Sequence, residues 1–253
     1  MKKRKLGQHF LYDDAILEKI ANAANISADD TVVEIGPGTG PLTEKLIDRA
    51  KTVIAIELDK NLYDRLKVRF RGVCNLELVH GDALKYDYRA IGTFKVAANI
   101  PYYVTTPLIF RLLDETDTLT GMTLMVQKEI AERIASPPGK KSYGVLSIMT
   151  QLVSDPEIKF IVRRDSFRPP PEVDSAVVGF NVLKDKKVQL TNEKLFIAVV
   201  KTSFSMRRKT LANNLRGFCA DIGDLLKSIG IDPRRRPETL SIDEFARIAN
   251  ALS

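Results

Sequence analysis

Short apolar runs alternate with helical patterns along the first half of this chain, and this alternation limits the fold more than any other feature. The apolar runs have the length of buried strands and span residues 31–35, 52–56, 76–79, 94–98 and 122–126. Helical patterns lie before and between them, at 13–24, 41–47, 62–70 and from Thr106 onward. Strands that alternate with helices predict a parallel sheet with right-handed crossovers.

The later part of the chain changes character. Residues 158–162 and 176–182 read as two more strands, and the turn-rich segment 167–172 between them is too short for a crossover helix. They are therefore expected to form an antiparallel pair that closes the sheet. From about Thr191 the pattern is helical to the end. We expect an α/β domain over residues 1–185 and a small all-α domain over residues 186–253.

Composition limits where the protein works and what it binds. Hydrophobic residues make up 44% of the 253 residues, as in ordinary globular proteins. The apolar runs are far shorter than the ~20 residues of a membrane helix, and no apolar signal core follows the basic N-terminus. Cys74 and Cys219 lie far apart, and the chain has only two histidines. We expect a cytoplasmic protein with free thiols, no membrane contact and no metal.

The net charge is concentrated near the C-terminus. The chain carries +7, and residues 184–253 hold 14 Lys and Arg against 8 Asp and Glu, so they account for +6 of it. A basic excess of this kind indicates a polyanionic partner such as a nucleic acid. A solvated basic surface without a partner would give the same count, and this alternative stays open.

Four successive predicted strands end in glycine or polar residues. These ends are Gly36-Pro37-Gly38-Thr39-Gly40, Glu57, Gly81-Asp82 and Asn99. Each alone fits a tight turn or a helix cap, but the carboxyl ends of parallel strands share one edge of the sheet, where ligands bind. Glycines allow close approach of the backbone, Glu57 suits two ribose hydroxyls, and Asp82 can accept from an adenine amino group. The set predicts a nucleoside cleft.

The first of these strand ends indicates which nucleoside is bound. Its spacing, Gly-x-Gly-x-Gly, departs from the Gly-x-Gly-x-x-Gly of dinucleotide-binding folds. Glu34, just before it, would repel a pyrophosphate. An acidic residue there suits a cationic ligand, so S-adenosylmethionine, with its ammonium and sulfonium groups, is favoured over NAD.

The segment from Asn99 to Tyr102 can present an adenine for methylation. The Asn99 amide oxygen and the Ile100 carbonyl can each accept a hydrogen of the exocyclic amine, while Pro101 fixes the turn. Tyr102 can stack on the base, which is worth roughly 1–3 kcal/mol. Such a base must be flipped out of a helix or be single-stranded. A simple strand-ending turn with packed tyrosines is the alternative.

These motifs together resemble the rRNA adenine N6-dimethyltransferase family over nearly the whole chain. The resemblance is carried by Gly7–Leu11, Glu34–Gly40, Glu57, Gly81–Ala83, Asn99–Tyr102 and Phe167–Val177. The segments 127–134, 138–144, 207–211 and 235–241 are most similar to the small-subunit branch, the kasugamycin-resistance type.

The resemblance implies a Rossmann-like methyltransferase that dimethylates two adjacent adenosines near the 3′ end of 16S rRNA. It implies S-adenosylmethionine as donor, S-adenosylhomocysteine as product, the 30S subunit or its precursor as partner, and a role in subunit biogenesis. We expect it to act as a monomer. The donor contacts implied are His9, Leu11, Gly36, Gly38, Glu57, Asp82, Ala83 and Asn99.

Further roles follow from the same resemblance. Phe167 would be a second aromatic face against the target adenine, with core packing beside the Pro-rich turn as the alternative. Arg207, Arg208 and Lys209 would contact phosphates, or form a solvated helix end.

Three other functions share parts of this pattern. A 23S rRNA adenine methyltransferase of the erythromycin-resistance type has the same catalytic motifs, but the C-terminal segments argue against it. DNA adenine N6-methyltransferases commonly carry an acidic residue where Asn99 stands. A non-catalytic assembly factor that keeps the fold would not need both Asn99 and Tyr102 beside an intact donor cleft.

Overall fold

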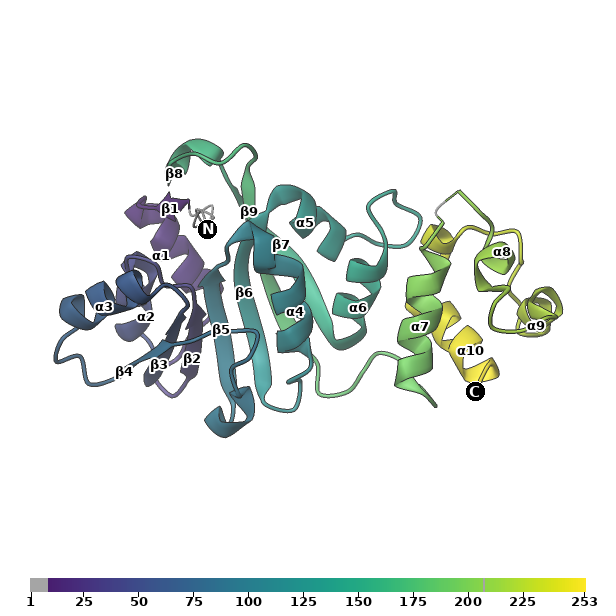
Figure 1. The fold of residues 1–253 in the computed structure, drawn as a ribbon, viewed down its shortest axis with the longest axis horizontal. Coiled ribbons are helices and arrows are strands. Elements are labelled where there is room, and N and C mark those ends of the chain that lie inside the picture. Colours follow the sequence, from purple (N-terminus) through teal and green to yellow (C-terminus); the bar gives the residue numbers. More distant parts are fainter. Residues whose placement is uncertain (1–8, 207) are drawn as a thin grey trace, which may run out of the picture. The chain divides into compact units, whose positions relative to one another are not determined.

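A seven-stranded sheet organises the first part of the chain (Figure 1). The structure, a computed structural model, describes residues 9–206 and 208–253. The strands lie in the order β4-β3-β2-β5-β6-β9-β7. They are β2 (Thr31–Ile35), β3 (Thr52–Glu57), β4 (Leu76–His80), β5 (Phe94–Asn99), β6 (Leu119–Gln127), β7 (Ser154–Val162) and β9 (Ser175–Val182).

The strand directions confirm the predicted sheet. The neighbouring pairs β4–β3, β3–β2, β2–β5 and β5–β6 are parallel, and β9 runs antiparallel to β6. The inner strands are buried because their residues are small or β-branched and apolar. Val32, Val33 and Val53 are fully shielded from solvent, as expected of a parallel sheet covered on both faces.

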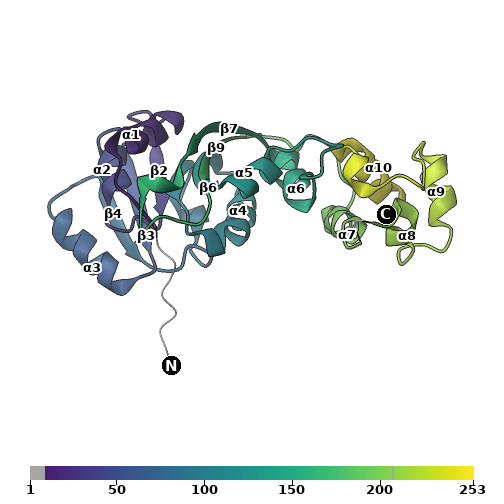
Figure 2. The same ribbon diagram turned by 90° about the horizontal axis from the view of Figure 1, so that it is seen from above.

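Helices connect and cover these strands. The helices of this part are α1 (Asp14–Ala23), α2 (Pro41–Ile47), α3 (Lys60–Arg69) and α4 (Thr105–Leu113). Polar caps fix where α1 and α3 begin: Asp13 accepts from the Ile16 N–H and Asp59 from the Asn61 N–H. Figure 2 shows α1, α2 and α3 at the β4-β3-β2 end of the sheet. The sequence predicted these helices.

A second, very small sheet was not predicted. Strand β1 (Phe10–Leu11) pairs antiparallel with β8 (Phe167–Arg168), so that Leu11 lies opposite Phe167. The His9 ring nitrogen Nδ1 lies 2.8 Å from the Pro169 carbonyl oxygen. This pairing brings the start of the described chain against the Pro-rich turn.

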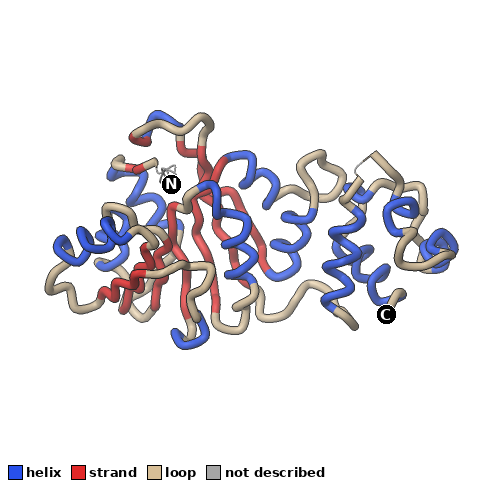
Figure 3. The backbone as a smooth tube through the Cα atoms, viewed as in Figure 1, coloured by secondary structure: helices blue, strands red, loops and turns tan. Residues whose placement is uncertain are grey.

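The chain divides into two compact units, which are residues 1–131 with 155–184 and residues 132–154 with 185–253. The helices that follow the first unit's α4 are α5 (Lys128–Ile134), α6 (Val145–Val153), α7 (Glu193–Ser203), α8 (Leu211–Leu215), α9 (Ile222–Ser228) and α10 (Ile242–Ala251). From residue 185 onward, the described residues form helices and loops without a strand (Figure 3). This confirms the helical C-terminal region.

Residues 132–154 belong to the second unit, whereas the predicted boundary assigned them to the first domain. Two contacts explain this. The Tyr143 ring meets the Phe204 ring edge-on at 6.4 Å, and the Lys187 N–H donates to the Leu152 carbonyl at 2.9 Å. The sequence analysis missed helix α6, in which the polar residues Ser147 and Thr150 are buried rather than exposed to solvent.

In residues 9–206 and 208–253, no helix combines the length and the apolar character that crossing a bilayer requires. The same residues include no group of three or more His, Cys, Asp or Glu side chains placed to hold a metal ion.

Gly40 offers a test of the packing at the start of α2. Its φ is +91°, and a Cβ there would lie 2.6 Å from the Phe70 ring. We expect Gly40→Ala to lower the free energy of unfolding by about 2–5 kcal/mol through backbone strain and overpacking. Urea unfolding followed by circular dichroism measures this loss.

Gly72 provides the matched control. Its φ is +86°, but a Cβ there would meet no atom within 4 Å. Gly72→Ala should therefore cost only the backbone strain, about 1–2 kcal/mol. Equal losses for the two variants would contradict the packing described for Gly40.

Candidate active site

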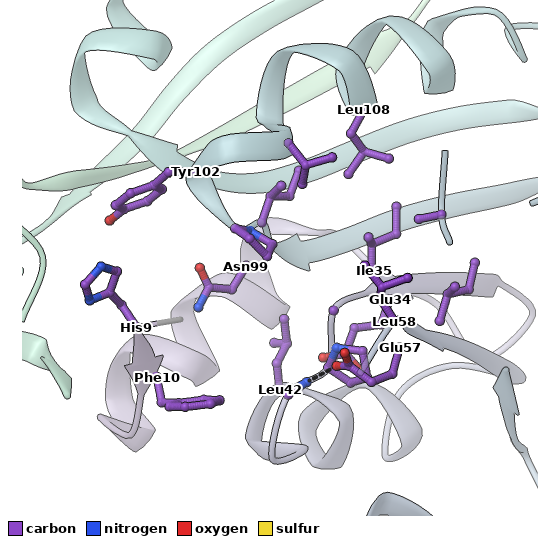
Figure 4. A pocket seen from close by; sticks show the side chains of 18 of the residues that line it. His9, Phe10, Glu34, Ile35, Leu42, Glu57, Leu58, Asn99, Tyr102 and Leu108 are labelled. Atoms are coloured by element: carbon purple, nitrogen blue, oxygen red, sulfur yellow. Dashed lines mark hydrogen bonds between the residues drawn. The ribbon is translucent and has the colours of Figure 1, made fainter. Parts of the chain in front are cut away.

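One cavity lies at the carboxyl ends of the parallel strands (Figure 4). Every residue predicted to contact the donor or the target adenine lines it. These residues are His9, Leu11, Gly36, Gly38, Glu57, Asp82, Ala83, Asn99, Ile100, Pro101, Tyr102 and Phe167. The structure brings them together, and their individual roles stay predictions.

The loop after β2 forms one wall of this cavity with bare backbone. Gly36 and Gly38 have φ values of +66° and +63°, a region that side chains disfavour. A Cβ on Gly36 would lie 3.6 Å from the Pro101 ring, and one on Gly38 would lie 3.2 Å from the Phe10 ring. Glycine at both positions therefore leaves room for a ligand against the backbone.

Glu57 at the end of β3 is held in place by two backbone donors. Its Oε2 accepts from the Gly38 N–H at 3.1 Å, the contact dashed in Figure 4, and its Oε1 accepts from the Asp59 N–H at 2.8 Å. Burial raises the pKa of Glu57, while these N–H donors stabilise its charged form. Each carboxylate oxygen keeps a second lone pair for a ligand hydroxyl.

The loop after β4 is fixed in a similar way. The Gly81 N–H donates to the Glu57 carbonyl at 3.0 Å, and the Leu84 N–H donates to Asp82 Oδ1 at 3.0 Å. The Tyr88 hydroxyl donates to the Ala83 carbonyl at 2.8 Å. Asp82 and Ala83 therefore face the cavity from an ordered turn.

Asn99 is the last residue of β5, and its amide points into the cavity between Tyr102 and Leu42 (Figure 4). The next residue is tied to β6, because the Ile100 N–H donates to the Met125 carbonyl at 3.2 Å. Among the residues that the structure describes, none makes a hydrogen bond to the Asn99 side chain. The amide is thus available to a ligand.

Aromatic and apolar side chains form the other wall. The His9 and Tyr102 ring centroids lie 5.9 Å apart. Phe167 is only 2% exposed and belongs to the same buried cluster as Leu11 and Leu17. Its ring therefore packs in the core, as the alternative interpretation held, and a contact with adenine stays a prediction.

The charge state of the Glu34 carboxyl differs from what the sequence indicated. This carboxyl is 2% exposed and accepts from the Thr43 hydroxyl at 2.6 Å. Burial, with a smaller effect of the Glu57 charge, raises the pKa of Glu34 to about 8, and the Thr43 hydrogen bond only partly opposes this. At pH 7 the carboxyl is mostly neutral, so its repulsion of a pyrophosphate is weaker than expected.

The predicted phosphate contacts lie in the second unit. Arg208 and Lys209 are exposed in the turn between α7 and α8, where the Lys209 N–H donates to the Met206 carbonyl at 2.9 Å. Arg207 lies outside the described residues.

Several lining residues lie outside the predicted site set, and two of them, Leu58 and Tyr103, are exposed. Leu58 is 51% exposed and Tyr103 is 58% exposed, although both line the cavity. Each directly follows a predicted site residue, Glu57 or Tyr102. Their position directly after predicted site residues in the sequence was the signal that could have identified them.

The sheet order, the antiparallel final strand and the cavity at the strand ends define a Rossmann-like methyltransferase fold. The sequence model of the family described as "Ribosomal RNA adenine dimethylase" matches residues 1–253. The chain belongs to this family, and it is an S-adenosylmethionine-dependent rRNA methyltransferase.

Similar proteins agree over almost the full length. "Ribosomal RNA small subunit methyltransferase A" of Clostridium botulinum (strain Loch Maree / Type A3) is 44% identical over 256 residues, covering 98% of this chain and 93% of that protein. The protein of the same name from Geobacillus thermodenitrificans is 44% identical over 265 residues, covering 99% and 90%.

Two solved structures share the fold of the whole chain. A dimethyladenosine transferase from Plasmodium falciparum has a TM-score of 0.83 at 32% identity, covering 95% of this chain and 96% of that one. The 23S rRNA methyltransferase ErmE has a TM-score of 0.77 at 26% identity, covering 96% and 99%.

The Glu34 carboxyl makes stability depend on pH. Its pKa is raised from 4.5 to about 8 in the folded protein, so the folded state binds the proton more tightly than the unfolded state. The protonated Glu34 therefore contributes fully to the free energy of unfolding below pH 4.5. This contribution is lost as pH rises to about 8, and the free energy of unfolding falls by up to about 1.4 kcal/mol per pH unit.

Glu34→Gln should remove this slope, because a neutral amide can still accept from the Thr43 hydroxyl. Urea unfolding at several pH values between 5 and 8 measures the difference. An unchanged slope in the variant would show that Glu34 is not the titrating group.

Proposed function

We propose that this protein transfers methyl groups from S-adenosylmethionine to N6 of two adjacent adenosines near the 3′ end of 16S rRNA. The observation that carries the proposal is one cavity lined by both Glu57 and Asp82 and by Asn99 and Tyr102. The first pair suits the donor nucleoside and the second suits an adenine. The names of the small-subunit relatives support the choice of rRNA.

The donor binds at the glycine end of the cavity. Its ribose hydroxyls donate to Glu57, whose orientation is fixed by Gly38 and Asp59. Its adenine amino group donates to Asp82 beside Ala83. The backbone of Gly36 and Gly38 leaves room for the remainder of the donor, and His9 and the β1 residue Leu11 close the cavity.

The target adenine binds at the other end. The Asn99 amide oxygen and the Ile100 carbonyl accept the two hydrogens of the exocyclic amine, which directs the nitrogen lone pair at the methyl group. Tyr102 stacks on the base, and Phe167 supports the same wall. Transfer moves the methyl from sulfur to nitrogen, the sulfonium becomes a neutral thioether, and the nitrogen then loses a proton. Catalysis is mainly positioning and electrostatics.

The partner is the 30S subunit or its precursor in the cytoplasm, where the protein acts as a monomer during subunit biogenesis. Arg208 and Lys209 are exposed and contact RNA phosphates, which orient the substrate without reading its bases. The basic excess of residues 184–253 supports this assignment.

A 23S rRNA adenine methyltransferase is the second candidate. The specific observation in its favour is the likeness to ErmE over 96% of this chain. The higher identity to the small-subunit relatives favours 16S rRNA.

Transfer of labelled methyl groups to undermethylated 30S subunits, to 50S subunits and to a DNA duplex tests the proposal. Nucleoside analysis of the product should give dimethyladenosine in 16S rRNA from 30S subunits. Label in 23S rRNA or in DNA would overturn the choice of substrate. Donor binding without any transfer would instead favour an assembly factor.

Matched substitutions at the two ends of the cavity should separate donor binding from turnover. Glu57→Ala should raise the donor Kd about 10- to 100-fold, because charge-assisted hydrogen bonds contribute about 1.5–3 kcal/mol. Asn99→Ala should lower kcat about 100- to 1,000-fold with the donor Kd nearly unchanged. Calorimetry measures the donor Kd, and single-turnover assays measure the rate of methyl transfer. If Glu57→Ala lowered kcat and Asn99→Ala raised the donor Kd instead, the assignment of the two ends of the cavity would be reversed.

The basic turn predicts a salt effect. The double variant Arg208→Gln/Lys209→Gln should weaken RNA binding and reduce the slope of log K against log salt by about 2. Filter binding at several salt concentrations measures this slope. Lys227→Gln is the control and should change the slope less, because Lys227 is already paired with Asp224. An equal change of slope in the control would contradict the phosphate contacts assigned to Arg208 and Lys209.

A further inference from the structure

The hydroxyl of Tyr102 is held by a residue outside the strand-end loops. The Tyr102 and Ser175 hydroxyl oxygens lie 2.7 Å apart, and either group can donate. Ser175 is the first residue of β9, is fully buried and lies opposite Gln127 of β6. The tyrosine thus reaches across the end of β6 to the antiparallel strand.

The contact with Tyr102 gives the buried Ser175 hydroxyl its hydrogen-bond partner. A hydroxyl buried in a strand needs a hydrogen-bond partner, and across residues 9–206 and 208–253 the Ser175 side chain finds one in Tyr102 alone. Alanine would fill nearly the same volume without that need. A serine here is therefore explained by the tyrosine rather than by packing.

Tyr102 is otherwise fixed at its backbone end. The Val104 N–H donates to the Pro101 carbonyl at 3.1 Å, and the Ile100 N–H donates to Met125 of β6 at 3.2 Å. These bonds define the path of the main chain but leave the side chain free to rotate. The contact with Ser175 fixes the far end of the ring, beside His9 and Asn99 (Figure 4).

The phenol remains a neutral hydrogen-bonding group. Burial raises the pKa of Tyr102, and the Ser175 hydrogen bond opposes this only in part. At neutral pH the ring therefore stays protonated and does not act as a base. Its contribution is the position of its face.

We propose that Ser175 is a positioning residue for methyl transfer, because its hydroxyl fixes the Tyr102 ring in the orientation that stacks on the target adenine. This inference rests on the proposed function of the cavity. Ser175 acts through Tyr102 and not through the donor, since the donor residues Glu57 and Asp82 lie on other strand ends.

A double-mutant cycle tests the inference. Ser175→Ala and Tyr102→Phe each remove one hydroxyl and keep the remaining side chain. Each should lower kcat about 3- to 10-fold, the equivalent of one ordinary hydrogen bond, with the donor Kd unchanged. The double variant should be no slower than the slower single variant, because both changes break the same contact.

Ser154→Ala is the matched control. Ser154 is also fully buried at the start of a strand, but its hydroxyl donates to the Thr150 carbonyl at 2.6 Å and it does not line the cavity. It should leave kcat unchanged. Unfolding midpoints from circular dichroism confirm that all variants are folded.

The assay uses whichever ribosomal RNA the wild-type protein methylates, so an error in the proposed substrate does not affect the comparison of variants. Transfer to 50S instead of 30S subunits by the wild-type protein would overturn the proposed substrate alone. Wild-type kcat for Ser175→Ala, additive losses in the double variant, or a weakened donor Kd would overturn the role of Ser175. A loss of kcat equal to that of Ser154→Ala would do the same.

Discussion

The parallel pairing of β2 with β5 is the constraint on which the rest of this structure depends. Val32 lies opposite Lys95 and Val33 opposite Val96, so both strands end at the same edge of the sheet. From there the chain continues to β3 on one side and to β6 on the other. The two loops diverge and leave a crevice, the position where open α/β sheets bind ligands. The proximity of Gly36 to Pro101 shows how closely the two loops still approach.

The crevice becomes a site because hydrogen bonds within the protein fix the residues of its loops. Glu57 is fixed by two backbone donors and Asp82 by one. On the other side of the crevice, Asn99 ends β5, and the Tyr102 hydroxyl is anchored on β9. Rigid donors and acceptors of this kind need little reorganisation during a reaction. In our account the fold contributes to methyl transfer mainly by holding two nucleosides in a fixed relation, and the side chains carry little acid or base chemistry.

The sequence predicted the sheet, and the gathering of the site residues at one edge of it, for a common reason. Strands, helices and polar strand ends are local features, and the topology of a parallel sheet brings the ends together. The exceptions depend on contacts that no local pattern encodes. The pairing of Leu11 with Phe167 joins two-residue strands far apart in the chain. The neutral state of Glu34 follows from burial, and Ser175 meets Tyr102 only because β9 lies next to β6. Helix α6 buries its polar Ser147, whose hydroxyl donates to the Arg133 carbonyl.

The most direct test of the central claim is a crystal structure of the protein with S-adenosylhomocysteine. Our account predicts that the ribose hydroxyls bind the Glu57 carboxylate, that the adenine lies beside Asp82, and that the sulfur faces the Asn99 amide. A ligand whose adenine occupies the Asn99 and Tyr102 end of the cavity, or that binds elsewhere, would contradict the assignment of the two ends and with it the proposed route of the methyl group.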